Sequence, residues 1–481
     1  MTLQIDLDDL ALFALLLGAA VAAGEGLRRL GGRPESTRRV VHALVGLATA
    51  AAPEWFDVPD GIYLLASVFF LGNAVALARG WLPSMHAVER RSWGTVLFPL
   101  ALIAALGLTW SPLADRVWAL QAAFAVLALA DPAASMVGLR WERGRAGRKT
   151  AAGSLAFAVI AIVVTATVLT VAGPDRGVSW VVAASLSAAA LATIAEALGR
   201  NGWDNVWIVL AVVVVLTVAD GADSGVLGLA TGLAAVFGWG TWRVGALDAS
   251  GALAGSLLAW GLVAIGGWAW AVPALAFFVL SSTLSRLGHQ RKASAEALAA
   301  KGSRRDARQV LANGGVALAA LAASAFVAGP GLYVAFVGSF AAAAADTWAT
   351  EIGTLIGGST RRLGLGPRVP PGTSGGVSWG GTLGAVLGAT SVTLPAAWLI
   401  GASGGWMLAL VGAGVSGAVL DSVLGATLQA RYRAADGRLT ERSVADGVAL
   451  PLAGGQSWLG NDGVNAACTV AGGLLAAMLV A

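Results

Sequence analysis

The sequence has little charge and almost no cysteine. Only 12% of its 481 residues are Asp, Glu, Lys or Arg, too few to cover the surface of a water-soluble protein of this length. The single cysteine, Cys468, excludes an internal disulfide and argues against redox chemistry and a thiolate metal site. The first apolar run, from Leu10 to Ala23, follows acidic rather than basic residues, so we expect no cleavable signal peptide.

Apolar and small residues are abundant instead. Hydrophobic residues make up 57% of the chain, and the mean hydropathy is +0.75. Apolar runs of about 20 residues, long enough to cross a bilayer, recur from end to end. The 65 glycines suit close helix packing in lipid. We therefore predict an all-α fold, a polytopic transmembrane helical bundle of about sixteen spans. The span centres are expected near residues 17, 47, 69, 101, 127, 162, 188, 212, 232, 258, 277, 319, 343, 388, 415 and 472.

The basic residues predict which side of the membrane each loop faces. Every Lys and Arg except Arg116 and Arg176 falls in a loop after an odd-numbered span, and basic loops stay in the cytoplasm. We expect an integral protein of a bacterial inner membrane, with both termini outside and the active sites on the cytoplasmic side. These loops account for the pI near 9.7, so no nucleic-acid partner is expected.

An acidic motif occurs twice, eight predicted spans apart. LADPAASMVG (129–138) and AADTWATEIG (344–353) both read Asp, two residues, Ala, Ser or Thr, two residues, Gly. Each is followed by a basic small-residue segment, RKTAAGS (148–154) or PRVPPGTSGGVS (367–378), and then by further acids. Because eight is an even number, the two halves face the same way. We predict two parallel repeats, residues 1–225 and 226–481.

The repeated acids predict metal-dependent chemistry on phosphates. A carboxylate at the bilayer centre costs roughly 2.5–3.5 kcal/mol, so Asp131 and Asp346 are candidate catalytic residues, with Glu351 as a third. Each could instead be a helix-packing carboxylate bonded to a neighbouring hydroxyl. Carboxylates and amides are the hard oxygen ligands that Mg²⁺ prefers. The candidate metal ligands are Asp131, Glu196, Asp204, Asn205, Asp346, Asp421, Asn461 and Asp462.

The small-residue segments are candidate phosphate cradles, because backbone N–H groups and basic side chains bind phosphate. The candidates are Lys149, Thr150, Gly153 and Ser154 in the first half, and Arg368, Thr373, Ser374, Gly375 and Gly376 in the second. The glycines could instead serve only close helix contacts. His42 lies one helical turn after Arg38 and could bind nucleotide or fill a polar helix interface. GRAGRKT (144–150) lacks the Walker A spacing, which excludes a soluble P-loop kinase.

These motifs resemble two families of membrane enzymes. Residues 30–220 are similar to the dolichol kinase and phytol kinase family through RRVVH (38–42), LADPAASMVG, RKTAAGS and EALGRNGWDN (196–205). Residues 240–481 resemble the plant phytyl-phosphate kinase family through RRDARQVLANG (304–314), ADTWATEIG, VPPGTSGGVSWGGTLGA, DSVLGATLQ and NDGVN. The resemblance implies CTP as the phosphate donor, Mg²⁺ and an isoprenoid alcohol acceptor. It also makes Arg304, Arg305, Gln309 and Asn313 ligands for the nucleotide or lipid phosphate.

We therefore predict a fused two-step enzyme of the bilayer. The first half would phosphorylate an isoprenoid alcohol with CTP, and the second would phosphorylate the monophosphate to the diphosphate. Two alternatives stay open. A CTP-dependent cytidylyltransferase would release pyrophosphate rather than CDP. A secondary transporter would also combine a two-fold repeat with intramembrane acids, but its site should lie near the membrane midplane.

Overall fold

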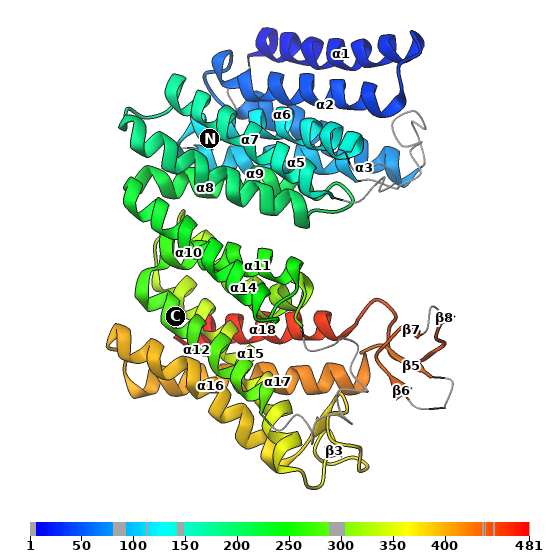
Figure 1. Ribbon diagram of the computed structural model, residues 1–481, viewed down its shortest axis with the longest axis vertical. Helices are drawn as coiled ribbons and strands as arrows, with labels where there is room; N and C mark the ends of the chain where they lie inside the picture. The colour runs from blue at the N-terminus through cyan, green and yellow to red at the C-terminus, as the bar shows by residue number, and fades with distance from the viewer. Residues whose placement is uncertain are drawn as a thin grey trace. The chain divides into compact units, whose positions relative to one another are not determined.

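The computed structural model describes residues 6–79, 93–111, 114–141, 149–287, 304–434, 437, 439–445 and 448–480, and these residues are largely helical (Figure 1). Within them, twelve helical stretches are long and apolar enough to cross a membrane. Each of the predicted span centres lies inside a helix. The predicted class, a polytopic helical membrane protein, is confirmed, whereas the number of membrane crossings stays a prediction.

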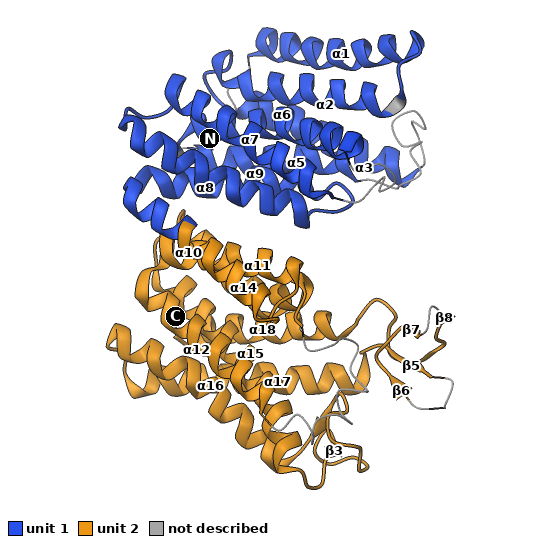
Figure 2. Ribbon diagram, viewed as in Figure 1, with its two compact units in different colours: residues 1–231 blue, residues 232–481 orange. Residues whose placement is uncertain are grey.

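The chain divides into two compact units (Figure 2), which we call unit 1 (Met1–Thr231) and unit 2 (Gly232–Ala481). The helices of unit 1 are α1 (Leu7–Arg29), α2 (Pro34–Ala51), α3 (Asp60–Ala78), α5 (Gly94–Thr109), α6 (Val117–Trp141), α7 (Ala151–Val171), α8 (Gly177–Leu198) and α9 (Asp204–Gly221), with a 3₁₀ turn at Ala52–Glu54. Helix α10 (Ser224–Arg243) contains the division, and the predicted boundary at 225/226 falls at its start.

Unit 2 continues with seven further helices among its described residues. They are α11 (Ala249–Gly261), α12 (Gly267–Arg286), α14 (Ala307–Ala323), α15 (Pro330–Ile356), α16 (Trp379–Ile400), α17 (Gly404–Thr427) and α18 (Asn461–Val480). A π-helical turn, Leu262–Gly266, precedes Gly267 at φ 64°, which breaks α11 from α12. Leu247 before α11 pairs with Arg305, while Ser285 near the end of α12 bonds Glu351, which interacts with Arg305. The 38-residue stretch Ala249–Arg286, which includes α11, the π-helical turn and α12, therefore begins and ends at the same end of unit 2.

One buried helix organises each unit. Helix α6 buries 56% of its most apolar stretch and α15 buries 61%, the two highest values among the candidate spans. Helix α6 packs against α2, α5, α7 and α9, and α15 packs against α12, α14, α16, α17 and α18. The pairs α6–α7, α7–α8, α8–α9, α6–α9 and α5–α9 have the counterparts α15–α16, α16–α17, α17–α18, α15–α18 and α14–α18. The last helices of both units thus follow the same packing order, whereas the two parallel repeats stay a prediction.

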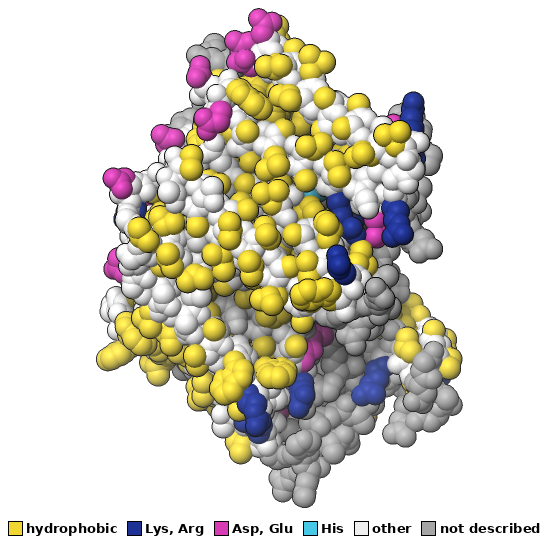
Figure 3. Space-filling model, turned by 45° about the horizontal axis from the view of Figure 1, so that its top comes forward, with side chains coloured by type: hydrophobic (Ala, Val, Ile, Leu, Met, Phe, Trp, Pro, Cys, Tyr) yellow, Lys and Arg dark blue, Asp and Glu magenta, His cyan; other side chains and the backbone are white. Residues whose placement is uncertain are grey.

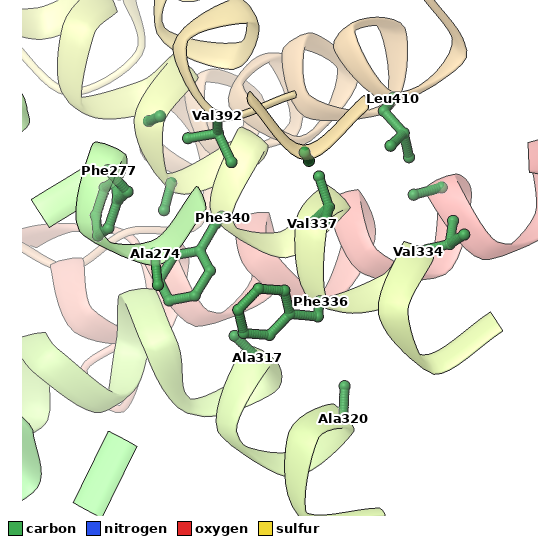
Figure 4. Packing of buried hydrophobic residues seen from close by; sticks show 14 of the residues in the cluster. Ala274, Phe277, Ala317, Ala320, Val334, Phe336, Val337, Phe340, Val392 and Leu410 are labelled. Carbon is green, nitrogen blue, oxygen red and sulfur yellow. The ribbon is translucent and has the colours of Figure 1, made fainter. Parts of the chain in front are cut away.

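The core of unit 2 is built around α15. Phe336, Val337 and Phe340 of this helix meet Phe277 of α12 and Leu410 of α17 (Figure 4), and all are nearly inaccessible to solvent. Phe336 and Phe340 pack edge to face with ring centroids 5.1 Å apart. Just beyond these rings, α15 carries a run of fully buried alanines, Ala341 to Ala345. The large rings fix the position of α15, and the alanines let its neighbours come close to Asp346.

Short antiparallel strands interrupt the helices, which the sequence analysis did not predict. They are β1 (Trp110–Ser111) with β2 (Ala114–Asp115), β3 (Arg361–Arg362) with β4 (Gly376–Val377), β7 (Val444–Ala445) with β8 (Val448–Ala449), and a sheet in the order β6 (Leu439–Thr440), β5 (Arg431–Arg433), β9 (Leu452–Gly454). Tyr432 is paired with Thr440 on one side and Leu452 on the other. Strands β5 to β9 form an extension between α17 and α18.

The surface has the polarity that a membrane protein requires. On the face shown in Figure 3, a broad apolar area separates acidic side chains, which gather mainly at the left edge, from basic side chains, which gather mainly at the right. Large apolar side chains such as Leu71, Val163 and Leu229 are more than half exposed on helices of candidate spans. Such exposed apolar side chains are suited to contact with lipid tails.

Candidate functional site

The first acidic motif lies at a close crossing of α6 and α7. Thr150 is the N-cap of α7, and its hydroxyl accepts the Gly153 N–H at 3.1 Å. A Cβ at Gly138 would lie 2.7 Å from Thr150 Oγ1, and one at Gly153 would lie 2.9 Å from the carbonyl oxygen of Ala134. The start of α7 therefore packs directly against Ala134 and Gly138 of the motif, which leaves room only for small residues there. Asp131 lies on α6 about one turn before this crossing.

The second motif makes the same crossing between α15 and α16. Ser378 is the N-cap of α16, and its hydroxyl accepts the Gly381 N–H at 3.1 Å. A Cβ at Gly353 would lie 3.1 Å from Ser378 Oγ, and one at Gly381 would lie 3.2 Å from the carbonyl oxygen of Ala349. The counterparts of Thr150 and Gly153 are thus Ser378 and Gly381. The sequence analysis named neither of them, since its candidates in this segment end at Gly376.

In unit 1 a lysine connects the predicted acids. Lys149 Nζ lies 2.5 Å from Glu196 Oε1 and 3.1 Å from Asp204 Oδ2, and Ser154 Oγ lies 3.4 Å from Glu196 Oε2. Glu196 is only 4% exposed. Burial opposes the charge on Lys149, but Asp204 and Glu196 outweigh it and raise the pKa of Lys149 above its ordinary value. Lys149 therefore stays a cation held between two carboxylates.

Asp131 faces a histidine rather than a second carboxylate. His42 Nε2 on α2 lies 3.9 Å from Asp131 Oδ2 and 3.2 Å from the carbonyl oxygen of Leu127. A carbonyl only accepts, so His42 Nε2 carries the hydrogen in this bond. Arg38, Lys149 and Asp204 act on Asp131 electrostatically. Unit 1 thus brings the predicted residues together with both signs of charge.

Asn205 does not join this group. Its Nδ2 donates to the carbonyl oxygen of Gly94 at 3.2 Å, which ties the start of α9 to α5. The structure gives Asn205 a helix-connecting contact, and a ligand role for it stays a prediction.

In unit 2 the two predicted acids meet each other. The carboxyl groups of Asp346 on α15 and Asp421 on α17 lie within hydrogen-bonding distance. Asn465 of α18, with its amide turned so that the nitrogen donates, gives bonds of 3.2 Å to Asp421 Oδ2 and to the carbonyl oxygen of Asn461. Asp462 lies in the first turn of α18. Among the described residues, no salt bridge joins Asp346 or Asp421 to a base.

Glycines explain why these acids meet. A Cβ at Gly414 would lie 2.9 Å from Ala341 Cβ, and one at Gly417 would lie 2.7 Å from Ala342 Cβ. Gly414, Gly417 and Asp421 follow one another at helical spacing on one side of α17. Helix α17 therefore approaches α15 closely and brings Asp421 to Asp346.

The predicted catalytic residue Glu351 has its contacts elsewhere than at Asp346 and Asp421. Ser285 Oγ of α12 donates to Glu351 Oε1 at 2.6 Å, and Arg305 interacts with Glu351 electrostatically. Gln309 belongs to a capping box with Asp306 at the start of α14, and Asn313 Nδ2 donates to the Gln309 carbonyl at 3.0 Å. Arg304 lies beside Gly245. The nucleotide roles of these side chains stay predictions.

The predicted segment 367–378 packs against the end of α17. Ser374 Oγ lies 3.0 Å from Gln429 Oε1 and 2.8 Å from Glu441 Oε1. Glu441 also interacts with Asp421, so the strand extension adds an acid that the sequence analysis missed. Gly375, at φ 77°, packs on Ala426. Three further candidates have local roles: Thr373 donates to Pro370, Arg368 bridges Arg361, and Gly376 begins β4.

The donor sets of the two units fit a divalent cation differently. In unit 2, the Asp346 and Asp421 carboxylates are hard oxygen donors that lie together without a base, which suits Mg²⁺. In unit 1, the Lys149 ammonium already lies between Glu196 and Asp204. Across the described ranges, no three His, Cys, Asp or Glu side chains are placed to hold a metal ion.

The fold and these two clusters define an integral membrane protein with charged groups buried among its helices. A model of the family described as "Integral membrane protein DUF92" matches residues 232–473. The chain belongs to this family of integral membrane proteins. The match covers unit 2 almost completely and includes Asp346, Asp421 and Glu441.

Three relatives extend this comparison. A protein named phytol kinase, from Synechocystis sp., is 32% identical over 208 residues, which cover 41% of this chain and 86% of the relative. Protein PGR of Arabidopsis thaliana is 30% identical over 208 residues, 38% of this chain and 72% of the relative. An uncharacterized membrane protein of Methanocaldococcus jannaschii is 30% identical over 183 residues, 38% of this chain and 75% of the relative. No solved structure matches.

Proposed function

We propose that the protein is a bifunctional, CTP-dependent kinase of isoprenoid alcohols. Unit 1 phosphorylates the alcohol, and unit 2 phosphorylates the resulting monophosphate to the diphosphate. The similarity to a protein named phytol kinase supports a kinase of the isoprenoid class. One observation supports the two steps: the aspartate, the Ala–Gly crossing and the capped start of the next helix occur once in each unit.

The charges of unit 1 suit a neutral acceptor. Phosphoryl transfer mainly requires positioning and neutralisation of charge on the transferred group. Lys149 and Arg38 supply positive charge close to Asp131. Asp131 then accepts a hydrogen bond from the alcohol and orients its oxygen toward the terminal phosphate of CTP. The acceptor's apolar chain remains among the helices and lipid.

The charges of unit 2 suit an acceptor that already carries phosphate. Asp346 and Asp421 would hold Mg²⁺, which supplies neutralisation of phosphate charge when bound. Asn465 fixes the orientation of Asp421 through its 3.2 Å bond. We expect CTP and the lipid monophosphate to meet beside this carboxylate pair on the cytoplasmic side.

The test uses purified protein in detergent with CTP, Mg²⁺ and a panel of prenols, namely phytol, geranylgeraniol and farnesol. Mass spectrometry should find prenyl monophosphate and diphosphate, and the nucleotide product should be CDP. Pyrophosphate with a cytidylylated lipid would identify a cytidylyltransferase instead. If no prenol is converted by well-folded protein, the proposed function is wrong.

A further inference from the structure

Two arginines that the sequence analysis did not single out converge on the end of α17. Arg362 of β3 donates through Nη2 to the carbonyl oxygen of Ala426, and Arg431 Nη2 of β5 lies 3.4 Å from the same oxygen. The two strands come from different segments, and Arg362 and Arg431 lie 69 positions apart in the sequence. The fold therefore brings two guanidinium groups to one acceptor.

One carbonyl oxygen does not compensate two positive charges. Basic side chains commonly cap the last carbonyls of a helix, but a single guanidinium suffices for one carbonyl. In the described part of the chain, no carboxylate pairs with Arg362 or Arg431. Arg431 Nε is buried without a hydrogen-bond partner, and an unsatisfied buried donor is costly. Burial, and then the charge of Arg362, lowers the pKa of Arg431 below its ordinary value.

The arginines lie next to the carboxylates of unit 2. Ala426 follows Asp421 by five residues, about 7.5 Å along a helix axis. A Cβ at Gly425, one turn after Asp421, would lie 3.1 Å from the Gly375 nitrogen and 3.4 Å from Ser374 Cβ. Bases and acids are thus neighbours without being paired with each other. This arrangement suits a ligand that carries a phosphate group and a bound cation. The phosphate would then pair with the arginines, and the cation with the carboxylates.

We propose that Arg362 and Arg431 form a phosphate-binding pair beside Asp346 and Asp421. Its ligand is a phosphate group that accepts several N–H bonds, for which the planar guanidinium is suited. The identity of that phosphate rests on the proposed function, because both the lipid monophosphate and the nucleotide carry one. The extension between α17 and α18 is then part of the site, since it carries both Arg431 and Glu441.

The experiment measures binding by thermal shift and calorimetry in detergent, with three probes: inorganic pyrophosphate, CTP and farnesyl monophosphate. Arg362→Gln and Arg431→Gln should each weaken binding of at least one probe roughly 10- to 100-fold, the effect of losing a hydrogen bond to a charged group. The probe that responds shows which phosphate the pair holds. Arg431→Lys should retain part of the affinity, because it keeps the charge.

Arg361→Gln and Arg433→Gln are matched controls, because these exposed arginines occupy the same two strands. They should bind all three probes as the wild type does. The proposal is wrong if the wild type binds none of the probes, if the control variants lose as much affinity, or if Arg362→Gln and Arg431→Gln melt earlier but keep full affinity. The last result would leave them as helix caps.

The pair and the proposed function can fail separately. If the arginine variants lose pyrophosphate binding while the wild type converts no prenyl monophosphate, the pair stands and the function falls. If the wild type converts prenyl monophosphate while these variants bind every probe normally, the function stands and the pair falls.

Discussion

At the scale of single residues, Lys149 is the main difference between the cluster of unit 1 and the cluster of unit 2. It precedes the N-cap Thr150, and the corresponding residue before the N-cap Ser378 is Val377. Unit 1 therefore neutralises Glu196 and Asp204 with its own ammonium group, whereas Asp346 and Asp421 lie together without such a group. This difference predicts that divalent cations act mainly on unit 2.

Lys149→Met should destabilise the protein in detergent by about 1–3 kcal/mol, because it leaves the buried Glu196 and the partly buried Asp204 without their cation. Adding Glu196→Gln should recover part of this loss, since it removes one of the uncompensated charges. The measurement is thermal unfolding of the wild type, both single variants and the double variant. Equal melting of Lys149→Met and wild type would show that the ion pairs contribute nothing.

Some residues of the two clusters were predictable from the sequence, and others were not. Asp131, Asp346 and Asp421 were predictable because a carboxylate inside an apolar run stands out locally. Glu441, Arg362 and Arg431 lie in polar segments, where charge is ordinary. Their relevance depends on contacts such as Ser374 with Glu441, which are 67 residues apart in the chain. No local pattern predicts such a contact.

At the scale of elements, the crossing of α15 and α16 depends on glycine. A Cβ at Gly384 or Gly388 would lie 2.4 Å from the carbonyl oxygen of Trp348 or Ala344. Both contacts involve backbone, which cannot rotate away. Gly384 and Gly388 thus serve helix packing. They lie beyond the candidate phosphate segment 367–378, whose role stays a prediction.

Gly388→Ala should destabilise unit 2 by about 1–3 kcal/mol, the usual cost of overpacking. Gly412→Ala is the matched control, because nothing lies within 4 Å of a Cβ there. It should be neutral or stabilise by up to about 1 kcal/mol through helix propensity. Thermal unfolding of both variants tests this, and a stabilising Gly388→Ala would contradict the close crossing.

Helices were more predictable than strands. A span is encoded by about 20 consecutive apolar residues, so each predicted centre falls in a helix. Strands such as Arg431–Arg433 and Leu452–Gly454 have two or three residues and no alternating pattern. Their pairing depends on residues far apart in the chain, which hydropathy does not report.

At the scale of the whole molecule, the basic residues predict the orientation in the membrane. A cysteine replacing Ser36 or Ser359 should be shielded from impermeant thiol reagents in intact cells, and one replacing Asp57 or Asp175 should be labelled. The background is Cys468→Ala, which removes the native thiol. All four positions are exposed in the structure. Labelling of Ser359→Cys from outside would place the candidate site of unit 2 away from cytosolic CTP.

The account's central claim is that each unit performs one of two successive phosphorylations. The most direct measurement follows both lipid products over time for wild type, Asp131→Asn and Asp346→Asn, with CTP, Mg²⁺ and either prenol or prenyl monophosphate. Asp131→Asn should lose alcohol phosphorylation but still convert supplied monophosphate, because the cluster of unit 2 is unchanged. Asp346→Asn should accumulate monophosphate. If either variant, folded as the wild type is, loses both steps, the two clusters do not work as separate sites and the account is contradicted.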